Sequence, residues 1–368
     1  MDDIFYFVIN KQIIFDLIFL SLITIIKSFI TFKEFNLFNG NFLLVTDDGI
    51  YRFNLNTQNK SLINSFDNDV DYEMIEYVDI KKLSDDDGGY IFCKVSKYIY
   101  IISKNADQLI DKLTVDNEYT SYTQSSIIPY KSENNYFCIL SYINKQYKLT
   151  IYKFKINFNS TDDNELLVNT IIDNDNKSYI EEISCHLIYS SLYLKNLIIC
   201  FATNKNDFLL NAIIFNPENM SLLSSNYKYF DLSKQDSTFI RSIITYNKNI
   251  FFICLDQIAY PLRCQLYDFE NNLWSDYVNI GNSILGVQSN FNIYMTSKNE
   301  YILFCNYDVN KYVIYIYEQN FKAKYYYIYT FSKCESDYSF HTLIFNNDKC
   351  YLLVNCYSKN ENGTYKYS

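Results

Sequence analysis

Glycine, proline, histidine, tryptophan and arginine are all scarce in this chain. Its 368 residues include 7 Gly, 3 Pro, 2 His and 1 Trp. Arg52, Arg241 and Arg263 are the only arginines, and the formal net charge is −10. Binding to phosphate groups requires concentrated positive charge, and no tract of the chain is rich in Lys or Arg. The sequence therefore predicts no nucleic-acid partner.

Motifs that mark common enzyme classes are missing as well. The chain contains no glycine-rich phosphate loop, no nucleophile elbow and no Cys-x-x-Cys pair. These absences favour a non-enzymatic protein without a cofactor.

Aromatic residues are abundant instead. They make up 18% of the chain, with 38 Tyr and 29 Phe. Tyr, Phe and Ile suit pleated, half-buried surfaces, so this composition favours β-strands. Apolar residues account for 49% of the chain and charged residues for 20%, which is typical of a folded protein.

A short apolar run, usually ending in cysteine, recurs about every fifty residues. The last residues of these runs are Val45, Cys93, Cys138, Cys200, Cys254, Cys305 and Cys356. Each run is followed by a polar break and a second apolar run, and most are preceded by another strand-like segment. Four strands in a repeated unit of about fifty residues are typical of propeller blades. The sequence thus predicts an all-β fold, a β-propeller of about seven four-stranded blades, with six as the alternative.

The fifth unit carries a more specific pattern. Tyr267 and Trp274 stand at the Tyr-x6-Trp spacing of the kelch repeat, which this unit resembles. The turn sequences 215–219 and 53–56 are looser forms of the same pattern. Kelch blades carry a double glycine after their second strand, and this feature is missing here. The pair Gly88-Gly89 precedes its strand instead. The resemblance implies a kelch-like propeller.

The N-terminal segment is the most apolar part of the chain. Within Ile13–Phe32, the charged residues Asp16 and Lys27 leave only Leu17–Ile26 uncharged. This length suits the core of a signal peptide better than a membrane span, which needs about twenty residues. We therefore divide the chain into residues 1–32, a signal peptide or membrane anchor, and residues 33–368, the propeller. The alternative is an apolar segment that packs on the ring.

The last repeat stops after its second apolar run. Propellers usually close by pairing the two ends of the chain within one blade, which removes an exposed strand edge. Asp3–Asn10 is strand-like and could complete this blade.

Cysteines and glycosylation sequences bear on the compartment. The favoured interpretation of the ten cysteines is buried free thiols, because equivalent positions in neighbouring blades lie too far apart to be bridged. Cys254 and Cys264 are an exception, since a hairpin could place them opposite one another. Five Asn-x-Ser/Thr sequences occur, at Asn59, Asn159, Asn176, Asn219 and Asn362. We expect a membrane-associated or secreted protein, attached to a membrane through residues 13–32 in the first case, with a cytoplasmic location as the alternative.

The first strand of each blade should line the central channel, where propellers commonly bind ligands. Counting back from the anchor cysteines gives six polar candidates for ligand binding: Asp79, Gln124, His186, Arg241, Asn290 and His341. Both histidines fall in this set, but no metal ligand set is predicted. Arg52 and Arg263 fall on third strands, which argues against the three convergent arginines of a sialidase-type site.

These observations favour a non-enzymatic propeller whose loop faces recognise a protein or a glycan. One alternative is a kelch-like enzyme or metal-binding propeller with a site in its channel, suggested by the two histidines. The other is an intracellular scaffold, which free thiols would favour.

Overall fold

The computed structural model contains antiparallel strands and, among the described residues, one short 3-10 helix, η2 (Asp85–Asp87). It describes residues 4–9, 15–20, 32–38, 41–46, 49–54, 57, 59–66, 78–115, 125–143, 149–158, 165–170, 180–204, 209–229, 238–244, 250–257, 262–280, 291–295, 300–308, 311–318, 323–330, 338–346, 349–359 and 365–367. For residues 4–38, for nearly all residues after 302 and for parts of other strands, including Arg241, only the backbone is described.

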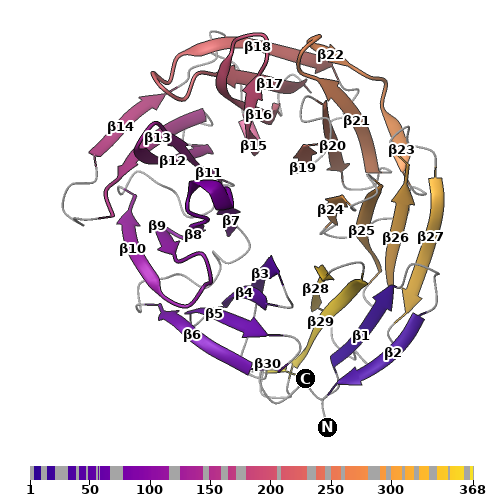
Figure 1. Cartoon of the computed structure of the whole chain (residues 1–368). Helices are drawn as coiled ribbons and strands as arrows, with labels where there is room; N and C mark the ends of the chain where they lie inside the picture. The colour runs from indigo at the N-terminus through magenta and orange to yellow at the C-terminus, as the bar shows by residue number, and fades with distance from the viewer. Residues whose placement is uncertain are drawn as a thin grey trace.

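Seven antiparallel sheets are arranged in a ring, with one strand of each sheet nearest the central axis (Figure 1). The first sheet comprises β3 (Phe32–Phe38), β4 (Asn41–Thr46), β5 (Gly49–Asn54) and β6 (Asn59–Ser65). The second comprises β7 (Asp79–Lys82), β8 (Ile91–Val95), β9 (Tyr98–Ile102) and β10 (Leu109–Thr114). The third comprises β11 (Ser125–Ser132), β12 (Asn135–Ile143), β13 (Leu149–Ile156) and β14 (Glu165–Thr170). The fourth comprises β15 (Ile180–Ser190), β16 (Lys195–Asn204), β17 (Leu209–Phe215) and β18 (Leu222–Tyr229).

The remaining three sheets continue the same order. The fifth comprises β19 (Thr238–Ile244), β20 (Ile250–Gln257), β21 (Leu262–Asp268) and β22 (Leu273–Trp274), and β23 (Val278–Ile280) also pairs with β21. The sixth comprises β24 (Phe291–Met295), β25 (Tyr301–Asp308), β26 (Lys311–Tyr317) and β27 (Ala323–Thr330). The seventh comprises β28 (Tyr338–Asn346), β29 (Lys349–Lys359), β1 (Ile4–Ile9) and β2 (Phe15–Leu20), and β30 (Tyr365–Tyr367) pairs with β29. The predicted fold class is confirmed, and each predicted anchor run lies on the second strand of its sheet.

The seventh sheet combines strands from both ends of the chain. Strand β1 pairs with β29 through Val8 and Tyr351, and β2 pairs along β1. Residues 15–20 of the apolar stretch are therefore the outermost strand of the seventh sheet, and residues 21–31 lie outside the described residues. Among the residues that the structure describes, no helix has the length and apolarity needed to span a membrane.

The core lies between neighbouring sheets, which pack face to face. One apolar cluster joins the third and fourth sheets and includes Ile139 and Ile198, and another joins the fourth and fifth sheets and includes Phe201 and Phe251. Middle strands are covered on both faces, so all five residues of β8 and of β9 are buried. This burial explains why these strands appear in the sequence as continuous apolar runs rather than as alternating patterns.

Two cross-strand disulfides lie within sheets. Cys254 on β20 is bonded to Cys264 on β21, as the hairpin spacing predicts, and Cys185 on β15 is bonded to Cys200 on β16. The prediction of free buried thiols is confirmed for Cys93 and Cys138 and is wrong for Cys185 and Cys200. Among the cysteines whose side chains the structure describes, equivalent cysteines of different sheets are not joined, but Cys200 bonds to a cysteine on the adjacent strand of its own sheet.

Candidate functional site

The predicted channel residues fall on the innermost strands wherever the structure describes them. Asp79 lies on β7, His186 on β15, Arg241 on β19 and His341 on β28. Each of these strands forms the end of its sheet that faces the axis (Figure 1). The side chains of Arg241 and His341, and all of Gln124 and Asn290, lie outside the described residues, so the convergence of all six stays a prediction.

Asp79 connects two neighbouring sheets. Its Oδ2 accepts hydrogen bonds from the backbone N–H of Ile127 at 2.8 Å and from the Ser126 hydroxyl at 3.3 Å. The backbone N–H of Cys185 in turn donates to Ser126 Oγ at 3.3 Å. A single polar chain thus links the innermost strands β7, β11 and β15. The Asp79 carboxylate is committed to these bonds, which gives it a structural role in the channel wall.

His186 packs toward the fifth sheet. Its ring centroid lies 5.4 Å from that of Phe251 and 6.4 Å from that of Phe201. Its neighbours Cys185 and Leu187 face the opposite way, toward the third sheet, where they join an apolar cluster. His186 therefore lies at the edge of a cavity between the second, third and fourth sheets.

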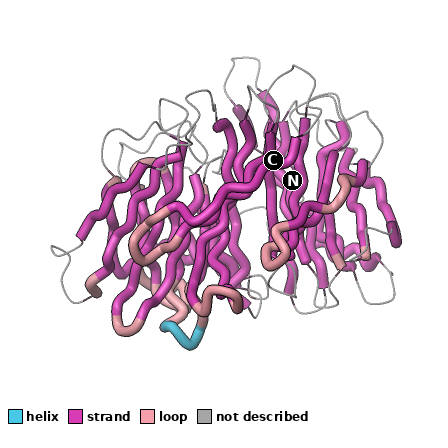
Figure 2. Tube along the Cα trace, turned by 90° about the horizontal axis from the view of Figure 1, so that it is seen from above, coloured by secondary structure: helices cyan, strands magenta, loops and turns pink. Residues whose placement is uncertain are grey.

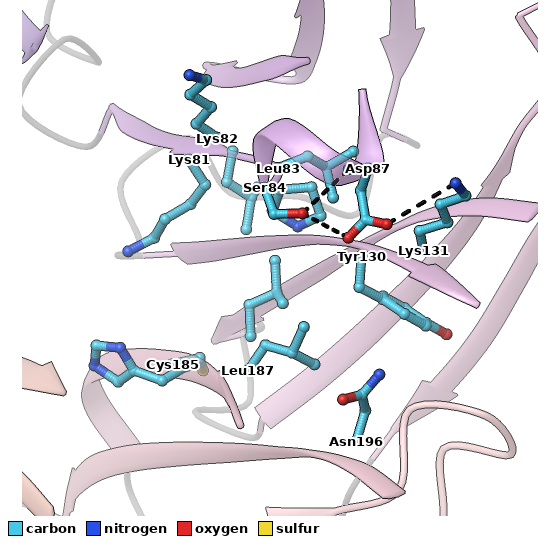
Figure 3. Close-up of a pocket in the computed structure, with 14 residues that line it drawn as sticks. Lys81, Lys82, Leu83, Ser84, Asp87, Tyr130, Lys131, Cys185, Leu187 and Asn196 are labelled. Atoms are coloured by element: carbon cyan, nitrogen blue, oxygen red, sulfur yellow. Dashed lines mark hydrogen bonds and ion pairs between the residues drawn. The ribbon is translucent and has the colours of Figure 1, made fainter. Parts of the chain in front are cut away.

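A cavity of about 320 Å³ lies where the second, third and fourth sheets meet (Figure 3). The second sheet contributes charged and hydroxyl side chains from β7 and η2, and the third contributes the end of β11. The fourth contributes residues of the hairpin β15–β16. The principal polar side chains around it are Lys81, Lys82, Ser84, Asp87, Lys131 and Asn196. Ser84 and Asp87 of the η2 turn line the cavity, and the edge of the ring that carries η2 also carries most of the described turns (Figure 2). We call this edge the hairpin face.

Positively charged side chains outnumber negatively charged ones among the residues that line the cavity. Three lysines and one carboxylate line it, although the whole chain is acidic. Lys82 Nζ lies 2.9 Å from Asp85 Oδ1, within direct hydrogen-bonding distance. By contrast, Lys81 Nζ lies 3.9 Å from Asp79 Oδ1, and Lys131 Nζ lies 3.9 Å from Asp87 Oδ1. These two ammonium groups are in looser ion pairs, with donors available for a ligand.

The turn that contains η2 shapes one wall of the cavity. Ser84 caps the 3-10 turn, and its hydroxyl donates to Asp87 Oδ2 at 2.7 Å. The turn ends at Gly88, whose φ of +98° is a conformation that L side chains rarely adopt. Gly88 thereby allows the chain to return into β8 immediately, which holds Asp87 beside Lys131.

Exposed apolar side chains lie on the hairpin β15–β16, near the cavity-lining residue Asn196. Tyr189 is 61% exposed and is the register partner of Asn196, so the two side chains share one face of the hairpin. Beyond them, at the tip of the hairpin, Leu192 and Leu194 are 68% and 76% exposed. The Ser191 hydroxyl donates to Glu270 Oε1 in the fifth sheet, which ties the tip to the ring. We call Tyr189 and residues 192–194 the apolar rim.

Two lysines are buried in the structure and were not predicted from the sequence as candidate residues. Lys94 on β8 is 1% exposed and is the register partner of Asp79. Burial lowers the pKa of Lys94 to about 7, against the opposing effect of the Asp79 charge. Burial also raises the pKa of the adjacent Cys93 thiol well above its usual range. The signal was available as one lysine within an otherwise apolar run, Ile91–Val95.

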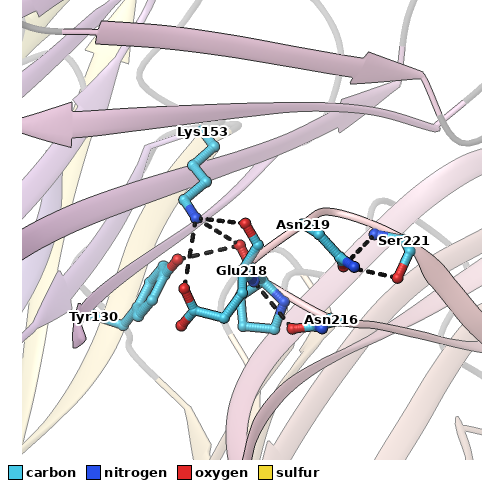
Figure 4. A network of polar contacts seen from close by, with 7 residues as sticks. Tyr130, Lys153, Asn216, Glu218, Asn219 and Ser221 are labelled. Carbon is cyan, nitrogen blue, oxygen red and sulfur yellow. Dashed lines mark hydrogen bonds and ion pairs between the residues drawn. The ribbon is translucent and has the colours of Figure 1, made fainter. Parts of the chain in front are cut away.

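Lys153 is the second buried lysine, and it joins the third sheet to the fourth (Figure 4). Its Nζ donates to the backbone carbonyls of Pro217 at 2.9 Å and Glu218 at 3.0 Å. The hydroxyl of Tyr130 also donates to the Pro217 carbonyl, at 3.2 Å. Desolvation by burial lowers the pKa of Lys153, and the nearby Glu218 charge opposes this effect. The contacts give Lys153 a role in blade-to-blade packing.

The arginines and candidate metal ligands are dispersed. Arg52 lies on β5, where it donates to Asn41 Oδ1 at 3.3 Å, and Arg263 lies on β21 with its guanidinium 5.0 Å from the Tyr277 ring centroid. Both are on third strands, as the sequence predicts. Within the part of the chain that the structure describes, no three residues among His, Cys, Asp and Glu gather to hold a metal ion.

Comparison with solved structures gives similar chains, of which the first supports the fold. A protein from Lactobacillus plantarum has 8% identity and a TM-score of 0.53, with 89% of this chain and 96% of that chain covered. A chain of the mitotic checkpoint complex has 9% identity and a TM-score of 0.49, with 88% and 89% covered. Aleuria aurantia lectin in complex with α-methyl-L-fucoside has 7% identity and a TM-score of 0.48, with 79% and 87% covered. No known family and no curated protein matches the sequence.

The seven sheets and their circular arrangement define the chain as a β-propeller. The likeness to solved structures extends to the fold alone, because the identities are low. The kelch repeat type stays a prediction.

Proposed function

We propose that this propeller is a non-enzymatic binding protein that recognises a protein or a glycan through its hairpin face. The observation that carries the proposal is the cavity between the second, third and fourth sheets, together with the apolar rim beside it. Concave sites with a few convergent polar groups are the usual form of ligand sites. Exposed apolar groups beside such a site favour recognition over solvation alone.

The cavity walls belong to three separate blades, and the polar chain from Asp79 through Ser126 to Cys185 connects their innermost strands. Such a wall is preorganised, because the strands that carry it are fixed by their own sheets. Binding then requires little ordering of the protein, which favours affinity.

A direct test fills the cavity. Asn196 lines it and is partly exposed at the start of β16, so Asn196→Trp should block entry without disturbing the core. Wild type and variant are screened against a display library of random twelve-residue peptides and an array of neutral, sialylated and sulfated glycans. We expect binders of the wild type that lose affinity for the variant. The control Thr57→Trp places the same side chain in an exposed turn of the first sheet and should leave binding intact.

Failure to bind any peptide or glycan, with the protein shown to be folded by circular dichroism, would refute the proposal. Equal binding to the wild type and to Asn196→Trp would place recognition elsewhere and would refute the assignment of the hairpin face.

We also propose that the protein is exported. Two disulfides support this location, since such bonds persist in oxidising compartments and are rare in the cytosol. Tethering through residues 13–32 has less support, because β2 pairs residues 15–20 with β1. Detection of reduced Cys254 and Cys264 in protein isolated from its natural source, with thiols blocked at lysis, would contradict export and favour the intracellular scaffold.

A further inference from the structure

The charge and shape of the cavity indicate a particular class of ligand. We propose that the cavity receives an acidic side chain of an extended peptide segment, and that apolar residues next to this side chain lie against the apolar rim. This inference rests on the proposed function, and it adds the chemistry by which the partner is recognised.

The acidic group is indicated by the cationic part of the wall. Lys81 and Lys131 are partly exposed on opposite sides of the cavity, and each Nζ is 3.9 Å from its carboxylate partner. An ammonium at this distance does not form a close hydrogen bond to the carboxylate. A ligand carboxylate entering the cavity would therefore gain charge-assisted hydrogen bonds without breaking a tight ion pair.

The carboxylates that face Lys81 and Lys131 already accept hydrogen bonds from the protein. Asp79 Oδ2 accepts hydrogen bonds from the Ile127 backbone and the Ser126 hydroxyl. Asp87 Oδ2 accepts the Ser84 hydroxyl at 2.7 Å. These bonds occupy one oxygen of each carboxylate, whereas neither carboxylate forms a close hydrogen bond to Lys81 or Lys131. A ligand carboxylate could therefore accept hydrogen bonds from these lysines, despite the net charge of −10 on the chain.

The apolar rim favours a peptide over a glycan. Leucine side chains offer no hydrogen bonds to sugar hydroxyls, and Leu192 and Leu194 are the most exposed large apolar residues that the structure describes. Leu194 also has a φ of +52°. Asn or Gly would adopt this left-handed conformation at lower cost. The exposure of the leucine side chains is consistent with a contact surface for apolar partner residues.

The test uses charge and rim variants of the full chain with the peptide display library. The charge variant is Lys81→Gln combined with Lys131→Gln, and its matched control is Lys155→Gln, which removes one charge from the exposed side of β13. The rim variant is Leu194→Asn. We expect selected peptides to contain Asp or Glu beside an apolar residue. Their affinity should fall about tenfold in the charge variant, should weaken with added salt, and should be unchanged in the control.

The rim variant separates binding from folding. Asn tolerates the left-handed conformation, so Leu194→Asn should unfold at the same denaturant concentration as the wild type or at a higher one. Its affinity for the selected peptides should nevertheless fall about fivefold. Equal peptide affinity for this variant and the wild type would overturn the role of the apolar rim.

The other outcomes separate this inference from the proposed function. Selected peptides without acidic residues, or peptides that bind the charge variant as tightly as the wild type, would overturn the inference and leave a binding propeller. Lysine-dependent binding of sialylated or sulfated glycans without any peptide binding would do the same. Self-association abolished by Leu194→Asn, without any peptide binding, would instead make a second copy the occupant. Absence of every binder would remove the proposed function as well.

Discussion

The buried Lys94 predicts a specific dependence of stability on pH. In the unfolded chain this lysine has the ordinary pKa of 10.5, whereas burial lowers its pKa to about 7 in the folded protein. Between these two values the unfolded chain binds more protons than the folded one. The free energy of unfolding therefore rises with pH across this window. Below pH 7 the lysine is charged in both states, and its burial then opposes folding.

The size of the change in the free energy of unfolding follows from the difference between the assay pH and the pKa of Lys94 in the folded protein. Each pH unit within the window contributes about 1.4 kcal/mol, so the rise from pH 6 to pH 8.5 is about 2 kcal/mol. Between these pH values, we expect the free energy of unfolding of the wild type to rise by this amount relative to that of Lys94→Met, in which the titrating group is absent. This range stays below the ordinary pKa of 9.0 of the buried thiols Cys93 and Cys138. Burial raises both thiol pKa values, so their ionisation in the unfolded chain would lower stability only at higher pH.

The assay is urea-induced unfolding, followed by tyrosine and tryptophan fluorescence, at several pH values. Lys155→Met is the control, because it makes the same substitution at an exposed position of β13 and should not reproduce the effect of Lys94→Met. Parallel profiles for the wild type and Lys94→Met would refute the reasoning, since they would mean that the charged lysine is accommodated in the folded state without a penalty.

Three further predictions concern the packing of the blades and the compartment. Lys153→Met should lower the free energy of unfolding by about 2 kcal/mol, and Tyr130→Phe by about 1 kcal/mol, because each removes a hydrogen bond to the Pro217 carbonyl. A double-mutant cycle by urea denaturation should show coupling, and strict additivity would contradict a shared acceptor. Replacing Cys254 and Cys264 together with Ala should cost about 3 kcal/mol, from the loop of 10 residues that the bond closes. An unchanged denaturation midpoint would contradict that bond. If the protein is exported by a glycosylating cell, Asn219 should carry a glycan, since it is exposed and its Oδ1 accepts the Ser221 hydroxyl at 2.7 Å. Mass spectrometry of Asn219→Gln beside the wild type measures this, and identical masses would count against export.

Much of the architecture could be predicted from local patterns. The anchor runs ending at Cys93, Cys138 and Cys200 lie on second strands because a strand covered on both faces must be apolar along its whole length. The same reasoning placed Asp79 and His186 on innermost strands. It could not determine where their side chains point, because neighbouring residues of a strand face opposite sheets.

Other features depend on contacts between distant segments. An apolar stretch such as residues 15–20 has the same composition whether it enters a membrane or pairs with β1, so its place in the seventh sheet required the structure. The bond between Cys185 and Cys200 depends on the register of β15 and β16, which the turn sets. Lys94 stands out in the sequence within an apolar run, but its burial became evident only from the third sheet, which packs against β8.

The sequence by itself determined the repeated sheet-forming unit, its approximate number and the acidic, motif-poor character of the chain. These properties follow from composition and spacing, which act locally. Only the tertiary structure decided the closure of the ring, the disulfide of the fourth sheet and the cavity bounded by Lys81, Lys131 and Asn196. The cavity is formed by residues from three blades, and their proximity arises from the packing of one sheet against the next.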